Sequence, residues 1–190
     1  QKIKLPYELW SMDKIKPNTD ALGKWLKKYK GPYVVSAKLD GISALYVDED
    51  GKQKLYTRGN GTHGQDISHL IPFLIREPAK NVAIRGEIII AKEVFDKKYS
   101  KKFANSRNFV AGMVNKKTID ANVVKDLDFV PYEVINPTLS PSEQMKYLDK
   151  IWTTPNAPKT VIYKIEETIT NEMLSQLLLE WRETYQYDID

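Results

Sequence analysis

The sequence predicts an α+β fold in which helices flank antiparallel sheets. Runs of β-branched and aromatic residues, typical of strands, recur along the chain. Helical patterns interrupt these runs, but they do not alternate with them regularly, as they would in a doubly wound α/β protein. The 190 residues suit one domain with a core of its own. Nothing in the composition marks a second domain, so we predict a single domain over residues 1–190.

The first half of the chain is expected to open with a helix and continue in short strands. Apolar residues at helical spacing predict a helix over Thr19–Lys30, and Gly31 followed by Pro32 offers a stop for it. Asp48–Gly51 is a turn signal between two of the strands that come next. These strands are expected at Tyr33–Leu39, Ile42–Val47 and Lys54–Thr57.

The second half is expected to contain three more strands and three helices. Val82–Ile90 is apolar on both sides of an Arg-Gly-Glu tripeptide, which predicts a strand. A capping box with proline at the first helical position, Ser140–Glu143, predicts a helix that runs to about Lys150. Ala91–Tyr99 has the pattern of a further helix. The remaining elements are strands at Phe129–Ile135 and Thr160–Ile165 and a closing helix whose apolar face carries Leu174, Leu177, Leu178 and Trp181.

Composition excludes several classes of protein. The chain has no cysteine, which rules out disulfides and thiolate metal sites and fits an intracellular protein. Its two histidines, His63 and His69, are too few for a histidine-based zinc site. No apolar run is long enough for a membrane span. The net charge of +4 fits a polyanionic partner, and basic clusters lie at residues 24–30, 96–102 and 116–117.

The first candidate site is the Lys-Leu-Asp-Gly motif at residues 38–41. Lys38 is expected where a strand ends in a tight turn, so that its amine projects from a rigid element. Asp40 lies two residues on and would share the same face of the strand. Gly41 removes a side chain where a ligand must come close. An uncharged lysine amine is a nucleophile, although a surface Lys/Asp pair before a turn is the simpler interpretation of these four residues alone.

A glycine-rich segment follows at Thr57–Asp66. Its glycines free the backbone and expose N–H groups, and such a loop can cradle a phosphate. Arg58 adds a bidentate donor. A flexible hairpin loop is the alternative interpretation.

Three further positions carry groups suited to nucleotides. Glu87 is a carboxylate inside an apolar strand, so it needs a partner such as a ribose hydroxyl, a metal ion or an arginine. Arg107, in a lysine-flanked segment at Phe103–Asn108, is suited to phosphate. Tyr132 can stack on a purine, although core packing is the more frequent use of such a tyrosine.

The order and spacing of these elements resemble the adenylation domain of NAD⁺-dependent DNA ligases. The series is Lys-x-Asp-Gly, Thr-Arg-Gly-x-Gly-Thr-x-Gly-x-Asp, Arg-Gly-Glu and Phe-Ala-Asn-x-Arg-Asn. The first motif is shared with ATP-dependent ligases, RNA ligases and capping enzymes, whereas the glycine loop and the Phe-Ala-Asn segment are more specific to the NAD⁺ branch. The resemblance runs from about Leu5 to Asp190 and implies a nucleotidyltransferase fold of the ATP-grasp-like ligase type.

The resemblance also implies a reaction. Lys38 would attack the α-phosphate of NAD⁺, forming a lysyl-AMP and releasing nicotinamide mononucleotide. The AMP would pass to the 5′-phosphate of a nick in double-stranded DNA, where the 3′-hydroxyl displaces it and seals the strand. Mg²⁺ would neutralise charge on the phosphates. These steps serve DNA replication and repair, so we expect an intracellular location, in the cytoplasm, the nucleoid or a viral replication site.

Each motif residue receives a role from the resemblance. Asp40 would orient the catalytic Lys38 or hold the metal, and Tyr132 would stack on adenine. The nucleotide would be bound by Lys38, Ser36, Gly41, Arg58, Glu87 and Tyr132. Phosphate or DNA would be contacted by Arg107, Asn108, Lys116 and Lys117. The metal would be held by Asp40, Glu87 and Asp190.

Three positions depart from the family pattern. Ser36 stands where the family often has a glutamate that reads the adenine amino group, so backbone groups are expected to read the base. Asn115 replaces a second arginine, and Lys116 or Lys117 is expected to substitute for it. Asn60 stands where aspartate is usual.

Several parts of the family's proteins are not found in the sequence. They are the module for the nicotinamide half, the second lysine just past Asp190, and the OB-fold, zinc and helix-hairpin-helix regions. We expect them on the same or a second polypeptide, and we expect the 190-residue chain alone to bind adenosine nucleotides weakly and not to seal nicks. Two other functions remain open: an ATP- or GTP-using ligase or capping enzyme, and an inactive relative that binds nucleic acid.

Overall fold

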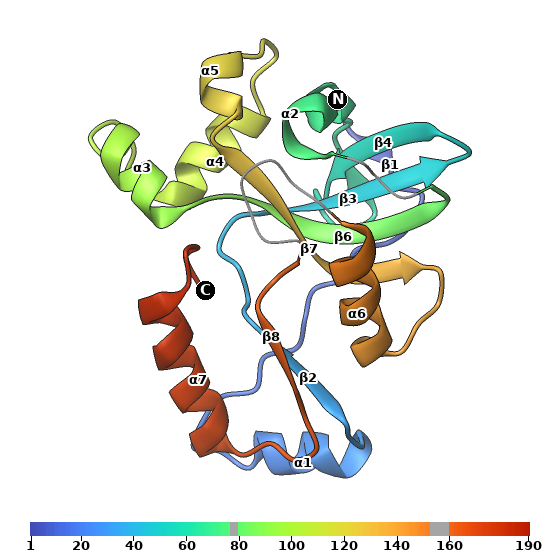
Figure 1. Cartoon of the computed structure of the whole chain (residues 1–190), viewed down its shortest axis with the longest axis vertical. Helices are drawn as coiled ribbons and strands as arrows, with labels where there is room; N and C mark the ends of the chain where they lie inside the picture. The colour runs from blue at the N-terminus through green and yellow to red at the C-terminus, as the bar shows by residue number, and fades with distance from the viewer. Residues whose placement is uncertain (77–79, 153–159) are drawn as a thin grey trace.

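The computed structural model describes residues 1–76, 80–152 and 160–190. Its centre is a four-stranded antiparallel sheet with the strand order β4-β3-β6-β7 (Figure 1). The turn between β3 and β4 places Asp50 and Gly51 at positive φ, as the Asp-rich turn signal predicted. The four strands are β3 (Ile42–Glu49), β4 (Lys52–Thr57), β6 (Val82–Ile90) and β7 (Leu127–Asn136).

Strand β6 is the buried spine of this sheet. All nine of its residues are buried, because it pairs with β3 on one side and β7 on the other while helices and loops cover its faces. One face packs on an aromatic group in which Trp152 lies edge-on to Tyr46, 5.4 Å between ring centroids, and 5.3 Å from Phe129. A central strand of this kind is a rigid support for the polar side chains that it carries.

A second, smaller sheet lies beside the central one. It consists of β2 (Tyr33–Ser36) and β8 (Tyr163–Glu166), which pair antiparallel although they are far apart in the sequence. Helices α1 (Ala21–Lys28) and α7 (Asn171–Thr184) flank this pair at the lower end of the molecule in Figure 1. After β2, the chain crosses from the small sheet to the central sheet through residues 37–41.

The remaining elements surround the central sheet. An aromatic cluster joins α3 to α4, since the ring of Phe109 stacks on Tyr99 at 4.2 Å and meets Phe103 edge-on at 5.0 Å. This cluster fixes the start of α4 relative to the sheet. The elements are β1 (Ile3–Lys4), paired with β5 (His63–Gly64); a 3₁₀ turn, η1 (Ser68–Leu70); and the helices α2 (Ile71–Leu74), α3 (Lys92–Lys98), α4 (Ser106–Val114), α5 (Ala121–Val124) and α6 (Pro141–Ile151).

The α+β class and the antiparallel sheets are confirmed. The strand Val82–Ile90 has the predicted bounds, and the Ser140 capping box opens α6 with both of its hydrogen bonds present. The strand predicted over Tyr33–Leu39 instead ends at Ser36, because the chain leaves β8 there to reach the central sheet. The strand predicted to begin at Thr160 begins at Tyr163.

Helix α4 had no counterpart in the prediction. It begins where Asn105 accepts a hydrogen bond from the Asn108 backbone N–H at 2.8 Å, a common N-cap arrangement. Across the ranges that the structure describes, every helix falls short of the length and apolarity that a bilayer crossing requires.

Candidate nucleotide-binding cleft

A cleft of about 1020 Å³ opens where residues 37–41 cross between the two sheets. Its volume suits a ligand the size of a nucleotide. Most of the residues predicted for the site line it: Ser36, Lys38, Asp40, Gly41, Arg58, Glu87, Arg107, Tyr132 and Asp190. Asn108, Lys116 and Lys117 are exposed and lie outside its lining. The cleft thus brings together the nucleophile and the nucleotide-binding residues proposed from the sequence.

Lys38 is held against Asp190, which is far from it in the sequence. Its Nζ donates to Asp190 Oδ2 at 2.5 Å, and both side chains are 54% exposed. The Asp190 N–H donates to the Lys38 carbonyl at 2.8 Å, so backbone and side chain are both paired. The hydrogen bond from Lys38, together with its charge, lowers the pKa of Asp190. We expected Asp40 to orient the amine, but it is Asp190 that contacts it.

A short ladder fixes the Lys38 segment to the C-terminal residues. Leu39 pairs antiparallel with Ile189, and the Asp40 N–H donates to the Asp188 carbonyl at 3.0 Å. The Asp188 carboxylate in turn accepts from Ser106 Oγ at 2.6 Å, which ties the ladder to the start of α4. Asp188 was not predicted as a site residue, and only its distance in sequence from residue 38 concealed its role.

Glu87 lies on β6 at the floor of the cleft and is 8% exposed. Its Oε2 accepts from the Gly41 N–H at 3.1 Å. Burial raises the pKa of Glu87 to about 7, even though this hydrogen bond and nearby cations favour the charged form. The cations are Arg85, Arg107 and Lys38. Glu87 is therefore poised to exchange a proton near neutral pH.

Gly41 is required by the close approach of two backbone segments. A Cβ atom at this position would lie 2.3 Å from the Ile88 carbonyl oxygen. The contact with β6 is thus a structural reason for glycine at this position, and the expectation that Gly41 also makes room for a ligand stays a prediction. That contact is also what brings the Gly41 N–H to Glu87.

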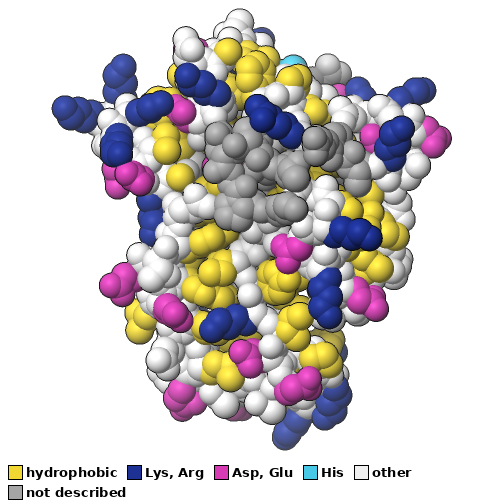
Figure 2. Space-filling model, in the orientation of Figure 1, with side chains coloured by type: hydrophobic (Ala, Val, Ile, Leu, Met, Phe, Trp, Pro, Cys, Tyr) yellow, Lys and Arg dark blue, Asp and Glu magenta, His cyan; other side chains and the backbone are white. Residues whose placement is uncertain are grey.

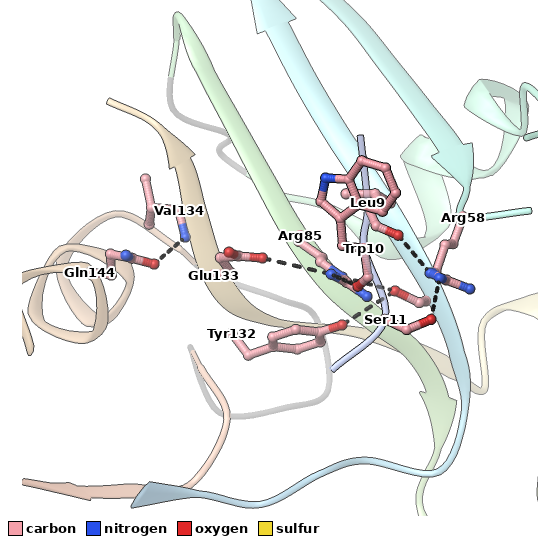
Figure 3. A network of polar contacts seen from close by, with 10 residues as sticks. Leu9, Trp10, Ser11, Arg58, Arg85, Tyr132, Glu133, Val134 and Gln144 are labelled. Atoms are coloured by element: carbon pink, nitrogen blue, oxygen red, sulfur yellow. Dashed lines mark hydrogen bonds and ion pairs between the residues drawn. The ribbon is translucent and has the colours of Figure 1, made fainter. Parts of the chain in front are cut away.

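Two arginines of the cleft hold an N-terminal segment, residues 9–17, which we call the strap (Figure 3). Arg58 donates to the Leu9 carbonyl at 2.8 Å and to Ser11 Oγ at 2.9 Å. Arg85 donates to the Trp10 carbonyl at 3.0 Å. Arg85 was not named as a site residue, although an arginine two positions from a buried glutamate was a usable signal.

Tyr132 lies on β7 with its ring beside the cleft (Figure 3). Its hydroxyl is 3.2 Å from Ser43 Oγ, and the guanidinium carbon of Arg85 lies 5.8 Å from the ring centroid. Burial raises the pKa of its hydroxyl, so the group is neutral at physiological pH. The hydroxyl and Arg85 thus fix the orientation of an aromatic ring at the cleft wall.

The glycine loop is a compact turn rather than an open phosphate cradle. Asn60 Oδ1 accepts the N–H groups of Thr62 at 3.0 Å and His63 at 2.8 Å, while the Gly61 N–H donates to the Arg58 carbonyl at 2.9 Å. These N–H groups are therefore not available to a phosphate. Gly59 must be glycine, because its φ is +56° and a Cβ would meet the His63 carbonyl oxygen at 2.0 Å.

The predicted metal ligands do not form a metal site of their own. Within residues 1–76, 80–152 and 160–190, no three histidine or acidic side chains gather closely enough to hold an ion. Asp190 is paired with Lys38, and Glu87 is bound to the Gly41 N–H. Since Mg²⁺ is commonly held by one or two carboxylates together with substrate phosphates, the metal-binding role of Asp40, Glu87 and Asp190 stays a prediction.

The chain is similar to a known protein family and to ligases of viruses and bacteria. It matches the model of the NAD-dependent DNA ligase adenylation domain over residues 1–190. It is 43% identical to the DNA ligase of Acanthamoeba polyphaga mimivirus over 198 residues, which cover 100% of this chain and 30% of the relative. A protein of Invertebrate iridescent virus 6, provisionally named a DNA ligase, is 39% identical over 188 residues, or 94% of this chain and 29% of the relative.

A bacterial relative shares a shorter stretch. The DNA ligase of Shewanella baltica is 36% identical over 109 residues, which cover 53% of this chain and 16% of the relative. The chain thus spans less than a third of the length of these relatives. The family match extends over every residue that lines the cleft, and the chain belongs to the NAD-dependent DNA ligase adenylation domain family.

Proposed function

We propose that this chain takes up AMP from NAD⁺ on Lys38, as the adenylation domain of a DNA ligase. The observation that carries the proposal is one cleft lined by Lys38, Glu87 and Tyr132 together, each in its motif. The antiparallel sheets on either side of this cleft support assignment to the nucleotidyltransferase fold of the ATP-grasp-like ligase type. One domain over residues 1–190 is part of the same proposal.

The proposed step transfers an adenylyl group to nitrogen. The Lys38 Nζ loses a proton and forms a bond to the α-phosphorus of NAD⁺. The bond from that phosphorus to the bridging oxygen breaks, and its electron pair leaves with nicotinamide mononucleotide. Asp190, at 2.5 Å, holds the resting ammonium and fixes its direction. The amine becomes nucleophilic only when this pair separates and the proton departs.

Each wall of the cleft has a part in binding the nucleotide. The Tyr132 ring, held by Ser43 and Arg85, offers a face on which adenine stacks. Glu87 is placed to accept a hydrogen bond from a ribose hydroxyl. Ser36 and Gly41 line the same cleft, and Arg58 borders it while holding the strap. A Mg²⁺ ion held by the nucleotide phosphates and by carboxylates of the cleft lining, Asp40, Glu87 and Asp190, would neutralise charge on the phosphates.

Ligation itself requires parts beyond this chain. We propose that the AMP passes to the 5′-phosphate of nicked double-stranded DNA, where the 3′-hydroxyl displaces it, and that the OB-fold and other ligase domains complete this work. Because NAD⁺ and DNA are intracellular substrates, the protein acts inside the cell or at a viral replication site.

Exposed cations near the cleft suit the DNA backbone. Arg107 and Asn108 lie in the first turn of α4, and Lys116 and Lys117 follow its end. Figure 2 shows further lysine and arginine side chains over the region of α3 and α5. Charges on several neighbouring helices can neutralise successive phosphates, which is the main source of affinity for DNA.

Parallel labelling tests the proposal. The intact protein is incubated with NAD⁺ or ATP labelled in the adenylate, and the labelled peptide is identified by mass spectrometry. We expect one AMP on Lys38 from NAD⁺ and none in Lys38→Ala. Label from ATP alone would show an ATP-using relative, and absence of label from both would show a domain that only binds.

A further inference from the structure

The strap supplies one wall of the cleft although it contains no helix or strand. Residues 11–17 all line the cleft and all are exposed. Arg58 and Arg85 hold the start of the strap through its backbone and Ser11. Near its end, Thr19 Oγ1 donates to the Lys16 carbonyl at 2.8 Å. The side chains between these anchors are therefore kept in place beside the cleft.

Lys14 is the strap residue whose charge reaches the reacting end of the cleft. The carboxylate of Asp190, which binds Lys38, is also influenced by the positive charges of Arg107 and Lys14. Three cations from three parts of the chain thus contribute positive charge at one carboxylate, namely Lys38 from the crossing segment, Arg107 from α4 and Lys14 from the strap. All three line the cleft. A phosphate that displaces this carboxylate from Lys38 therefore enters a part of the cleft with positive charge.

The ammonium of Lys14 is free to bind a ligand. In the part of the chain that the structure describes, Lys14 makes no hydrogen bond or salt bridge. Arg58 and Arg85, by contrast, donate hydrogen bonds to the strap. Lysine presents three donors on a flexible stem, and a phosphate oxygen is a strong acceptor for them. Exposed lysines are common on protein surfaces. Lys14 differs from most of them because it lines the same cleft as Lys38 and Asp190, on a segment that two arginines hold.

We expected Lys116 or Lys117 to substitute for the arginine that the family has at position 115, and this stays a prediction. Asn115 lines the cleft, whereas Lys116 and Lys117 lie outside its lining. Lys14, on the strap, is a cation that does line it. We propose that Lys14 binds a phosphate of the adenylate donor beside Lys38, an inference that rests on the proposed function of Lys38.

This position gives Lys14 an electrostatic role. When the phosphorus–oxygen bond breaks, the electron pair moves onto the phosphate oxygen of nicotinamide mononucleotide, and negative charge grows there. A cation beside that oxygen stabilises the transition state, in which the charge has grown, more than it stabilises the bound NAD⁺. Removal of Lys14 is therefore expected to slow adenylation as well as to weaken binding.

Single-turnover labelling of the intact protein with adenylate-labelled NAD⁺ tests this role. We expect Lys14→Ala to lower the second-order rate constant for label on Lys38 by about 10- to 100-fold, the loss typical of one charged hydrogen bond. Lys14→Arg should retain most of the rate. Asn115→Arg, added to Lys14→Ala, should restore part of it by returning a cation to the cleft. The matched control is Lys27→Ala on α1, which removes the same charge from an exposed position away from the cleft.

Binding measurements separate a phosphate contact from a structural role. By calorimetry, Lys14→Ala should weaken AMP binding and leave adenosine binding unchanged, with the same melting temperature as the wild type. An unchanged labelling rate, or equal weakening of AMP and adenosine, would overturn the inference while leaving Lys38 adenylation intact. Absence of label in the wild type would instead refute the proposed function itself.

Discussion

The Nζ of Lys38 and the Oδ2 of Asp190 lie 2.5 Å apart, although 152 positions separate the two residues in the chain. The ion pair directs the amine before substrate arrives. In the proposed reaction the pair must separate before the nitrogen bonds to phosphorus, so we infer that Asp190 both positions the amine and restrains it.

The first prediction concerns this pair. Asp190→Asn removes the negative charge that holds the Lys38 amine, so the amine should be less well directed. We expect the single-turnover rate of Lys38 adenylation at a fixed pH to fall several-fold relative to the wild type. Asp96→Asn, on exposed α3, removes the same charge away from the pair and should leave the rate unchanged. A rate in Asp190→Asn equal to that of the wild type would contradict a positioning role for Asp190.

The second prediction concerns Glu87 and stability. Burial raises the pKa of Glu87 to about 7, so the folded state holds this proton more tightly than the unfolded state does. The stability that protonated Glu87 contributes to the folded state is complete at low pH and is lost as pH rises through about 7. Glu87→Gln cannot ionise, so its free energy of unfolding does not suffer this loss. The free energy of unfolding of the variant minus that of the wild type should therefore increase by about 2 to 3 kcal/mol between pH 4 and pH 8. Urea unfolding across that range measures it, and a constant difference would refute it.

The third prediction contrasts two glycines. Gly41→Ala should lower the free energy of unfolding by at least about 1 to 3 kcal/mol, because its Cβ would lie 2.3 Å from the Ile88 carbonyl oxygen. Gly23→Ala, on α1, meets no atom within 4 Å and should raise it by up to about 1 kcal/mol. Thermal or urea unfolding of both variants distinguishes them. Equal changes in the free energy of unfolding of the two variants would mean that residue 41 does not pack closely against β6.

The fourth prediction concerns the anchoring of the strap. Arg85→Met keeps an apolar stem but removes the donor to the Trp10 carbonyl, so the strap should open more often. Limited trypsin digestion should then cut after Lys14 several-fold faster, while cleavage after Lys52, at the start of β4, stays unchanged. Tyr132→Phe, which removes the hydroxyl that contacts Ser43 but leaves the bond from Arg85 to the Trp10 carbonyl, is the comparison. Acceleration at every site would indicate general unfolding instead.

The fifth prediction concerns DNA. If Lys116 and Lys117 each neutralise a phosphate, the double alanine variant of the intact protein should bind nicked duplex more weakly. The slope of log K against log salt should fall by about 0.9 for each phosphate that the variant no longer neutralises. Lys27→Ala combined with Lys28→Ala on α1 removes the same charge from a different surface. Equal slopes in the two double variants would remove residues 116 and 117 from the interface.

Local patterns predicted the elements whose determinants are local. The apolar run of β6 and the Ser140 capping box each specify their structure within about ten residues, and both were predicted correctly. Lys38, Glu87 and Tyr132 were assigned to one site from motif order, and the cleft contains all three.

The features that the sequence did not reveal depend on contacts between distant segments. Strand β2 ends at Ser36, earlier than predicted, because its partner β8 extends no further. The side chain that contacts Lys38 is Asp190, from the other end of the chain. For the glycine loop the sequence left two alternatives open, a phosphate cradle and a hairpin loop, and the structure shows a turn in which Asn60 accepts from two N–H groups, a pairing that composition alone does not specify. Arg85 anchors the strap through the Trp10 carbonyl, a contact between residues 75 positions apart in the sequence.

The ladder between residues 38–40 and 188–190 has a consequence for biosynthesis. On the ribosome, Lys38 emerges roughly 150 residues before the segment that pairs with it, and contacts between such distant residues tend to form late in folding. The nascent chain therefore exposes Lys38 for most of translation without a complete cleft around it. If Lys38 is the nucleophile, we expect its adenylation to begin only after residue 190 has been synthesised.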